Sequence, residues 1–215
     1  MLLYIIRHGE TQYNAEKKMQ GSVDIPLNDN GRFLAEETAK GLADVKFDLL
    51  IASDLSRAYE TAQIVSGYAD IPLIKDKRIR EIDWGSWEGT AADGSEIEEL
   101  RDQLHSFFNH PSAFTGSPDG EVFANVFRRV NEFMDELTGN PELADKTILI
   151  ATHGVPSRAI LNYVDPVDPD EFWRGAVPAN CSVSICRIEN GKMEIEELDH
   201  IYYDKKYLTD FYPMK

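Results

Sequence analysis

Continuous apolar runs, separated by stretches with helical spacing, most constrain what this chain can fold into. The runs at residues 2–6, 49–52 and 147–151 are apolar at almost every position, which is typical of strands buried on both faces of a parallel sheet. Segments such as 29–42 and 155–163 carry apolar residues at helical spacing. Strands that alternate with helices predict an α/β fold with a largely parallel sheet.

A hairpin completes this pattern near the end of the chain. Residues 182–188 and 192–198 have the composition of strands and flank Asn190-Gly191, the strongest short signal for a tight turn. Their antiparallel pairing makes the predicted sheet mixed. The polar residues 9–28 predict a long loop, and loops of this length are often functional. The other expected elements are a helix through Ala58, Ala62 and Val65, a strand at 72–74, and helices near 96–108 and 121–138.

The length of 215 residues fits a single domain over residues 1–215. We expect residues 85–120, which include a Pro/Gly-rich stretch, to form a small helical cap inserted into this domain. The aromatic tail is expected to pack over the core, with a dimer contact as the alternative, so the oligomeric state stays open. Its aromatic residues are Tyr202, Tyr203, Tyr207, Phe211 and Tyr212.

The charge of the chain excludes two classes of partner. A formal net charge of −16 gives a surface that repels nucleic acid and anionic membranes. No apolar run is long enough to span a bilayer, and a first strand that starts at residue 2 leaves no room for a signal peptide.

Cys181 and Cys186 are expected on opposite faces of one strand, where they cannot bridge. We interpret them as reduced core residues of a cytoplasmic protein.

Polar side chains follow three of the predicted buried strands. Arg7-His8-Gly9-Glu10-Thr11 follows the first strand, Ser53-Asp54-Leu55-Ser56-Arg57 the second, and Thr152-His153-Gly154 the strand at 147–151. Ligands of open α/β sheets bind outside the carboxyl ends of the strands. We therefore expect two histidines and two arginines to meet at one edge of an otherwise acidic protein.

This set of side chains suits phosphoryl transfer. Arginine forks bind phosphate oxygens through charge-assisted bonds. A neutral histidine can attack phosphorus through one nitrogen while the other donates its proton to a fixed acceptor, and a second histidine can stabilise the transferring group. Gly9 and Gly154 are expected to let the backbone approach the anion, and Thr11 and Asn14 to add uncharged donors. The expected ligand is phosphate or a small phosphorylated metabolite.

The same residues resemble the opening motif of the histidine phosphatase superfamily, also called the phosphoglycerate mutase-like family. The resemblance implies a three-layer α/β/α sandwich, and its blocks follow in family order over nearly the whole chain. After Arg7-His8-Gly9-Glu10-Thr11 and Asn14, the matching blocks are Gln20-Gly21, Asp24-Ile25-Pro26-Leu27-Asn28, Gly31, Ser53-Asp54-Leu55-Ser56-Arg57-Ala58, Thr61-Ala62, Glu81-Ile82-Asp83-Trp84-Gly85, Trp87-Glu88-Gly89, Thr152-His153-Gly154-Val155 and Asn180-Cys181-Ser182-Val183.

The resemblance implies a role for each site residue. His8 would be the nucleophile and carry a phosphohistidine, while Arg7, Arg57 and His153 would bind and stabilise the phosphoryl group. Glu81 would be the general acid that protonates the leaving alcohol and then the base for water, a role that makes chemical sense because an alkoxide leaves poorly. The candidate substrate-binding residues are Thr11, Asn14, Gln20, Gly21 and Gly154.

We expect no metal and no cofactor. A dinuclear metal phosphatase would need several carboxylates and histidines at strand ends, and Asp54 is the only carboxylate placed directly at one. The three remaining histidines are assigned surface or packing roles: His105, His110 and His200.

The leading hypothesis is a metal-independent phosphatase that acts on a small phosphorylated metabolite. A cofactor-dependent phosphoglycerate mutase is the first alternative. Mutases carry extra lysines and arginines after the glutamate motif, whereas residues 88–106 are acidic and contain Arg101 but no lysine. Mutases also tend to have Trp where Tyr13 stands. A non-catalytic phosphate-binding module would need neither a nucleophile nor a proton donor, and the acidic surface disfavours a phosphatase of phosphopeptides.

Two features of the predicted cap concern the substrate. Gly120-Glu121-Val122 stands where many family members have Gly-Glu-Ser. Five phenylalanines either line an apolar substrate wall or, as we favour, pack the core of the cap: Phe107, Phe108, Phe114, Phe123 and Phe127.

Overall fold

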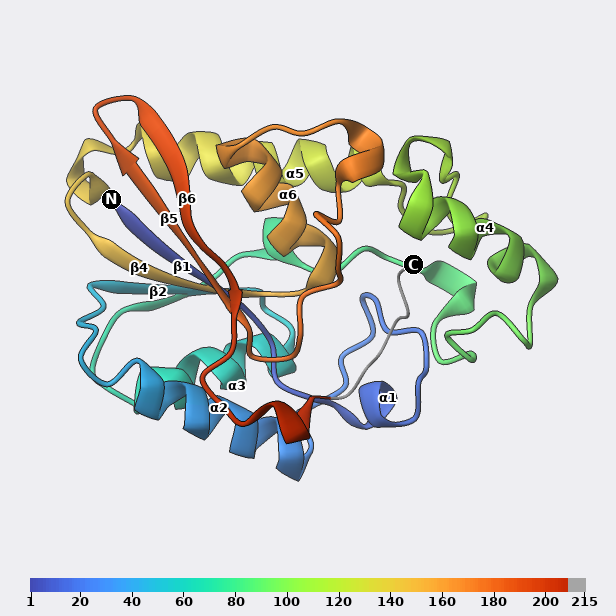
Figure 1. The fold of residues 1–215 in the computed structure, drawn as a ribbon, viewed down its shortest axis with the longest axis horizontal. Coiled ribbons are helices and arrows are strands. Elements are labelled where there is room, and N and C mark those ends of the chain that lie inside the picture. The colour runs from blue at the N-terminus through green and yellow to red at the C-terminus, as the bar shows by residue number, and fades with distance from the viewer. Residues whose placement is uncertain (209–215) are drawn as a thin grey trace.

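The computed structural model describes residues 1–208, and the sheet in this part of the chain has six strands (Figure 1). Their order is β3-β2-β4-β1-β5-β6. The pairs that β1 to β4 form with one another are parallel, and β5 and β6 add an antiparallel edge, which confirms the predicted mixed sheet. The strands are β1 (Leu2–Arg7), β2 (Leu49–Ala52), β3 (Leu73–Lys75), β4 (Thr147–Thr152), β5 (Val183–Glu189) and β6 (Lys192–His200).

Helices cover both faces of the sheet, which confirms the three-layer sandwich. The helices α2 and α3 lie on one face and α5 and α6 on the other, while α4 lies beyond the end of the sheet (Figure 1). The ends of these elements fall within two residues of most predictions. The helices are α1 (Gln12–Ala15), α2 (Asp29–Gly41), α3 (Ser56–Val65), α4 (Glu98–Asn109), α5 (Phe123–Gly139) and α6 (Gly154–Val164).

The prediction of an uninterrupted loop over residues 9–28 was wrong at α1. Thr11 caps this helix: its hydroxyl accepts a hydrogen bond from the backbone N–H of Asn14 at 3.2 Å, and its own N–H donates to the Asn14 side chain at 3.1 Å. A helix of four residues is too short to show helical periodicity in a sequence. The cap fixes Asn14 close to the end of β1.

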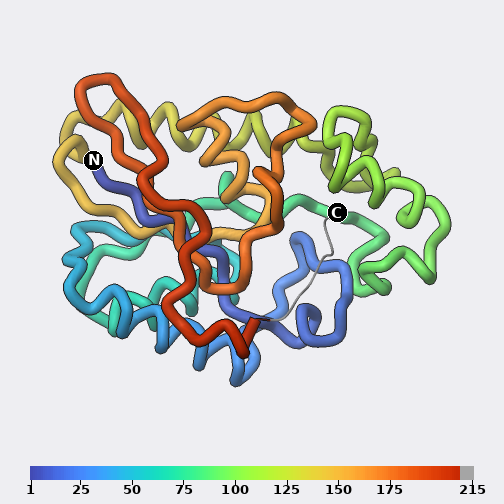
Figure 2. Tube along the Cα trace, viewed as in Figure 1, coloured from blue at the N-terminus to red at the C-terminus, as the bar shows by residue number. Residues whose placement is uncertain are grey.

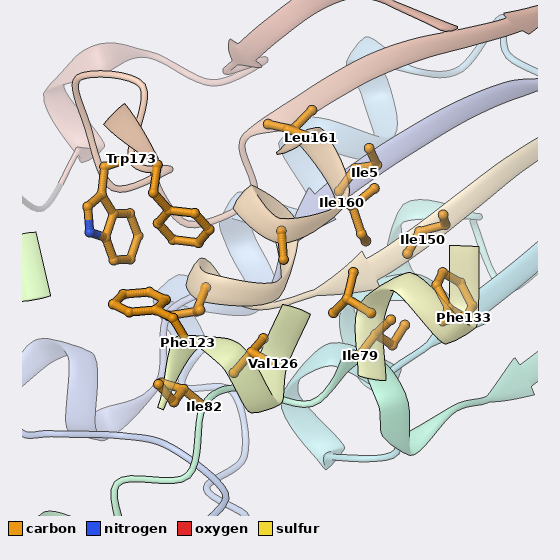
Figure 3. Packing of buried hydrophobic residues seen from close by; sticks show 14 of the residues in the cluster. Ile5, Ile79, Ile82, Phe123, Val126, Phe133, Ile150, Ile160, Leu161 and Trp173 are labelled. Atoms are coloured by element: carbon orange, nitrogen blue, oxygen red, sulfur yellow. The ribbon is translucent and has the colours of Figure 1, made fainter. Parts of the chain in front are cut away.

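The sheet separates two apolar cores. Leu3 and Ile5 of β1 belong to the core on the side of α5 and α6, whereas Tyr4 and Ile6 belong to the core on the side of α2 and α3. This alternation follows the two-residue period of a strand. Figure 3 shows side chains of the first core, where Ile5 lies close to residues of α6. Because both of its faces are buried, β1 delivers the residues that follow it to a fixed position.

The two cysteines lie in different cores, but the prediction that one strand carries both was wrong, because Cys181 lies in a turn before β5. Cys186 lies in β5 and packs in the core of α5 and α6, while Cys181 precedes β5 and packs in the other core. Both are buried free thiols. Burial raises the pKa of the Cys186 thiol to about 12, so it stays protonated near neutral pH.

Aromatic side chains join α4 to the sandwich. The indole N–H of Trp173 donates to the backbone carbonyl of Phe107 at 2.7 Å. The Phe107 ring stacks on Phe123 of α5, with 5.1 Å between the ring centroids. Phe107, Phe114 and Phe123 are buried, which confirms core packing for these three phenylalanines.

After β6 the chain returns along α2 (Figure 2). Tyr203 is buried, and its hydroxyl donates to the backbone carbonyl of Asn180 at 2.6 Å. The ring of Tyr207 lies 4.9 Å from that of Phe33 in α2. The tail up to residue 208 therefore packs on the core as expected, while Phe211 and Tyr212 lie outside the described residues. Within residues 1–208, no helix combines the length and apolar character needed to cross a membrane.

Candidate active site

The two strand-end histidines lie side by side. Because β1 and β4 are adjacent and parallel, with Arg7 opposite Thr152, the residues that follow these strands come together. The centroids of the His8 and His153 rings are 5.0 Å apart, and both side chains are buried. The backbone N–H of His8 also donates to the carbonyl of Thr152 at 2.9 Å, which continues the strand pairing up to the histidine.

The surroundings of His8 define its protonation state and tautomer. Burial, together with the charges of Arg57 and Arg7, holds the pKa of His8 well below its usual range, so the ring is neutral near pH 7. Its Nδ1 lies 2.7 Å from the backbone carbonyl oxygen of Gly9. A carbonyl oxygen can only accept, so Nδ1 carries the proton. The lone pair of a neutral His8 is therefore on Nε2.

His153 has the opposite tautomer. The guanidinium Nε of Arg57 donates to Nδ1 of His153 at 3.2 Å, and a guanidinium has no lone pair to offer. Nδ1 is therefore the acceptor, and the proton of the neutral ring is on Nε2. Burial and the charge of Arg57 hold the pKa of His153 well below its usual range. The Nε2 atom of His153 has no hydrogen-bond partner among residues 1–208, so this buried N–H can donate to a ligand.

The two arginines are held by backbone carbonyls. Arg57, one turn into α3, is fully buried and donates to the carbonyls of Gly21 at 2.6 Å and Val23 at 2.7 Å. Burial lowers the pKa of Arg57 to about 10, which leaves it positively charged near neutral pH. Arg7 donates to the carbonyl of Pro178 at 2.6 Å. These bonds aim two cations at the space around the histidines.

Glu81 lies on an irregular segment and reaches the N-terminus of α6. Its Oε2 accepts from the N–H of Gly154 at 2.8 Å, and its Oε1 accepts from the N–H groups of Val155 and Ile82, both at 3.0 Å. Burial raises the pKa of this carboxyl, although the bond from Ile82 and the charge of Arg7 act in the opposite direction. Oε2 makes fewer of these bonds than Oε1, so it has the lone pair that can hold a proton.

Gly9 has a packing role that the sequence interpretation did not foresee. A Cβ added at Gly9 would lie 2.5 Å from the carbonyl oxygen of Gly31 in α2, and the N–H of Gly9 donates to the Thr61 hydroxyl at 3.0 Å. The N–H of Gly9 is thus already bonded, and the approach of its backbone to an anion stays a prediction. At Gly154 the N–H is likewise engaged, by Glu81.

A cleft beside His8 brings together six of the ten predicted site residues. Arg7, His8 and Glu81 line it with the candidate substrate-binding residues Asn14, Gln20 and Gly154. Arg57 and His153 lie behind this surface, fully buried. The other two candidates support the site instead: Thr11 caps α1, and the carbonyl of Gly21 holds Arg57.

Part of the cleft wall is apolar. Phe107 and Phe108 of α4 line it together with Trp84, Trp173 and Val177. Phe107 thus belongs to both alternatives proposed for the phenylalanines, because it is buried in the core and still borders the cleft. This wall fits an organic group attached to phosphate better than a second charged group.

Three residues near the site were not predicted from the sequence. Lys18 lines the cleft and pairs with Glu16 at 2.7 Å. The side-chain amide of Asn180 donates to the backbone carbonyl of His8 at 2.9 Å. Arg129 of α5 donates to the backbone carbonyl of Glu81 at 3.0 Å. Only Asn180 left a signal in the sequence, since it lies in one of the matching blocks.

The carboxylate at the end of β2 is engaged by an arginine. Asp54 accepts two hydrogen bonds from Arg80, at 2.5 and 2.6 Å, and this pairing holds the pKa of Asp54 below its usual range. Within the described part of the chain, no three histidine, cysteine or carboxylate side chains form a group that could hold a metal ion.

Comparisons with known proteins agree with this arrangement. A family model of the histidine phosphatase superfamily (branch 1) matches residues 3–200. The chain is 30% identical over 203 residues to phosphoserine phosphatase 1 of Hydrogenobacter thermophilus, which covers 92% of this chain and 91% of that protein. It is also 30% identical over 167 residues to phosphoglycerate mutase-like protein 4 of Arabidopsis thaliana, which covers 76% of this chain and 71% of that protein.

A solved structure is also similar to this chain in fold and sequence. YhfR of Bacillus stearothermophilus superposes with a TM-score of 0.84 at 33% sequence identity, over 93% of this chain and 97% of that one. The chain belongs to the histidine phosphatase superfamily, as its motifs indicated. It is a phosphoric monoester hydrolase, the class of enzyme to which the named phosphatases among its relatives belong.

Proposed function

We propose that this enzyme hydrolyses a small phosphorylated metabolite through a phosphohistidine on His8, without a metal ion. The observation that carries the proposal is the bond from His8 Nδ1 to the Gly9 carbonyl at 2.7 Å, which leaves the Nε2 lone pair of a neutral ring for attack on phosphorus. Glu81 lines the same cleft. The buried free thiols Cys181 and Cys186 support a cytoplasmic location, where thiols stay reduced.

In the first step, Nε2 of His8 attacks phosphorus and the bond from phosphorus to the ester oxygen breaks. Protonated Glu81 gives its proton to that oxygen, so the product leaves as a neutral alcohol. Arg7, Arg57 and the Nε2–H of His153 stabilise the negative oxygens of the transferring group. The bond from Nδ1–H to Gly9 stabilises the positive charge that develops on the His8 ring.

In the second step, water hydrolyses the phosphohistidine. The Glu81 carboxylate takes a proton from water while the water oxygen attacks phosphorus, and the bond from phosphorus to His8 Nε2 breaks. Phosphate leaves, His8 returns to its neutral form and Glu81 is again protonated. The two steps together convert the ester and water into the alcohol and phosphate, and they restore both His8 and Glu81 without a metal or a redox partner.

The lining of the cleft favours hydrolysis over a mutase reaction. A mutase must hold the carboxylate of a second substrate, but the cations that line the cleft within residues 1–208 are Arg7 and Lys18, and Lys18 is already paired with Glu16. Arg101 of α4 is exposed and lies 3.4 Å from Glu98. We assign Arg7 to the phosphoryl group, which leaves no arginine for a second carboxylate. The apolar wall supports a phosphate ester whose alcohol part is largely apolar.

A metal-free assay tests the reaction class. We expect phosphate release from a panel of phosphate monoesters in the presence of excess chelator, at the same rate as without it, because protein side chains supply every charge that the mechanism uses. Interconversion of the two phosphoglycerates with a bisphosphate primer is measured in parallel. Loss of hydrolysis with chelator, or interconversion faster than hydrolysis, would reject the proposal.

Changing Glu81 to glutamine should affect esters according to their leaving group. Two substrates of similar size serve here: 2-phenylethyl phosphate, whose alkoxide needs a proton, and 4-nitrophenyl phosphate, whose phenolate does not. Because Glu81 also acts as the base in the hydrolysis of the phosphohistidine, which both esters share, the comparison uses the rate of leaving-group release in a single turnover. We expect Glu81→Gln to slow this release by about 100-fold for the alkyl ester and by less than about fivefold for the aryl ester, which is the scale of general acid catalysis. Glu99→Gln, an exposed position on α4, is the control. Equal slowing of the single-turnover release from both esters would remove Glu81 as the acid.

A further inference from the structure

Arg129 holds the irregular backbone that carries Glu81. From α5, its NH1 donates to the carbonyls of Arg78 at 2.7 Å and Arg80 at 2.6 Å, and its NH2 donates to the carbonyl of Glu81 at 3.0 Å. The segment from residue 80 to 84 belongs to no strand or helix, so no regular ladder of strand or helix bonds satisfies the carbonyls of Arg80 and Glu81. One guanidinium takes the place of that pairing.

Glu121 completes the arrangement. It accepts from Arg129 Nε at 3.0 Å and from NH2 at 2.9 Å, so all five N–H donors of the guanidinium are used. Glu121 is bonded to the same segment twice: its side chain accepts from the N–H of Asp83 at 3.1 Å, and its own N–H donates to the Asp83 carbonyl at 2.8 Å. The pair therefore bonds to the backbone before Glu81, at Arg78 and Arg80, and after it, at Asp83.

Neither partner touches the cleft. Arg129 and Glu121 are absent from its lining, whereas Glu81 is part of it. The charge of Arg129 also helps to lower the pKa of His153, but the hydrogen bonds of the pair act on the reaction through Glu81. Its carboxyl is held on one side by α6, and its backbone is held by Arg129. A displacement of about 1 Å in a catalytic group can reduce a rate by about 100-fold.

We propose that Arg129, held by Glu121, is a positioning residue for proton transfer by Glu81. This inference rests on the proposed function, in which Glu81 protonates the leaving alcohol. It explains why Arg129 of α5 donates three hydrogen bonds to backbone carbonyls near Glu81 and why Glu121, just before α5, holds Arg129 in this position.

The test uses the same two esters and four variants of the full chain. Arg129→Met removes the donors, Arg129→Lys keeps the charge but not the fork, and Glu121→Gln keeps the shape of the partner while removing its charge. Arg128→Met is the matched control, because Arg128 is the neighbouring, exposed arginine of α5. Folding is checked by circular dichroism, and if Arg129→Met does not fold, Arg129→Lys and Glu121→Gln carry the test.

We expect Arg129→Met to reduce the single-turnover rate of leaving-group release by about 30- to 100-fold for 2-phenylethyl phosphate and by less than about threefold for 4-nitrophenyl phosphate. Arg129→Lys and Glu121→Gln should also slow the alkyl ester more than the aryl ester, but by smaller factors than Arg129→Met. KM for the aryl ester should be unchanged. Combining Arg129→Met with Glu81→Gln should add little to the loss from Glu81→Gln alone, because both changes remove one proton transfer. The Arg128→Met control should match the parent enzyme on both esters.

The experiment distinguishes a failure of this inference from a failure of the proposed function. If folded Arg129 and Glu121 variants slow both esters by the same factor, the pair has only a structural role and the inference fails. If Glu81→Gln itself shows no selectivity between the esters, the proposed function fails first. Additive losses in the double variant would also contradict the inference.

Discussion

Replacing His8 with alanine should reduce hydrolysis of every phosphate monoester by roughly four to six orders of magnitude, the scale of loss when an enzyme is deprived of its nucleophile. The change removes the atom that forms the covalent bond to phosphorus. The other stabilising groups stay in place, because Arg57 and His153 are held by each other and by the carbonyls of Gly21 and Val23. Steady-state assays with an aryl ester check the loss, since its leaving group needs no acid.

The control for this change is another histidine. His105→Ala alters an exposed residue of α4 that lies against His110, so we expect activity within about twofold of the parent, in line with a surface substitution. Folding of the His8→Ala protein is confirmed by its unfolding curve. Activity of more than about one percent in His8→Ala would contradict the covalent mechanism.

The second large effect concerns the buried arginine Arg158. Its side chain is fully buried and makes a two-pronged ion pair with Asp199, with N–O distances of 3.0 and 2.5 Å. We expect Asp199→Asn to lower the free energy of unfolding by about 3 kcal/mol, because it leaves a buried charge without its counter-charge. Asp199 has a φ of +53°, a conformation that asparagine also tolerates, so the change isolates the charge. Denaturant unfolding measures the difference.

An exposed pair provides the comparison. Arg187 and Glu196 lie 2.5 Å apart, but their side chains are 46% and 36% exposed, and exposed pairs contribute about 1 kcal/mol or less. Glu196→Gln should therefore change stability by no more than about 1 kcal/mol. If Asp199→Asn and Glu196→Gln lowered the free energy of unfolding equally, the burial of Arg158 would not determine the size of the loss.

Arg158 also connects stability to the site. It donates to the carbonyl of Ala176 at 2.7 Å, and two residues later the carbonyl of Pro178 accepts from Arg7 at 2.6 Å. The segment between them contributes Val177 to the cleft. A loss of the Arg158 ion pair is therefore expected to weaken phosphate binding as well as folding.

The parts of the site at strand ends were predictable from the sequence. Buried parallel strands show as apolar runs, and the residues that follow neighbouring strands must meet at one edge of the sheet. This logic placed His8 beside His153, and it placed Arg57 one turn into the helix after β2. The role of Glu81 came from the family resemblance, because its irregular segment has no periodic pattern to place it. The roles assigned to these residues stay predictions until they are measured.

The supporting contacts were not predictable, because they join residues far apart in the sequence. Arg129 and Glu81 are 48 residues apart, and Arg158 and Asp199 are 41 residues apart. A charged side chain on a helix is normally solvated, so neither arginine is distinguished in the sequence from exposed ones such as Arg128. The contact of Gly9 with Gly31 also depends on how α2 packs on the loop, which local sequence does not encode.

Direct detection of the phosphohistidine tests the central claim. The enzyme is mixed with an aryl phosphate, quenched within milliseconds under alkaline conditions that preserve phosphohistidine, digested and analysed by mass spectrometry. We expect one phosphoryl group on the peptide that contains His8, and none in the His8→Ala protein. A phosphoryl group found on another residue, or turnover with no phosphorylated enzyme at any quench time, would contradict the proposed mechanism.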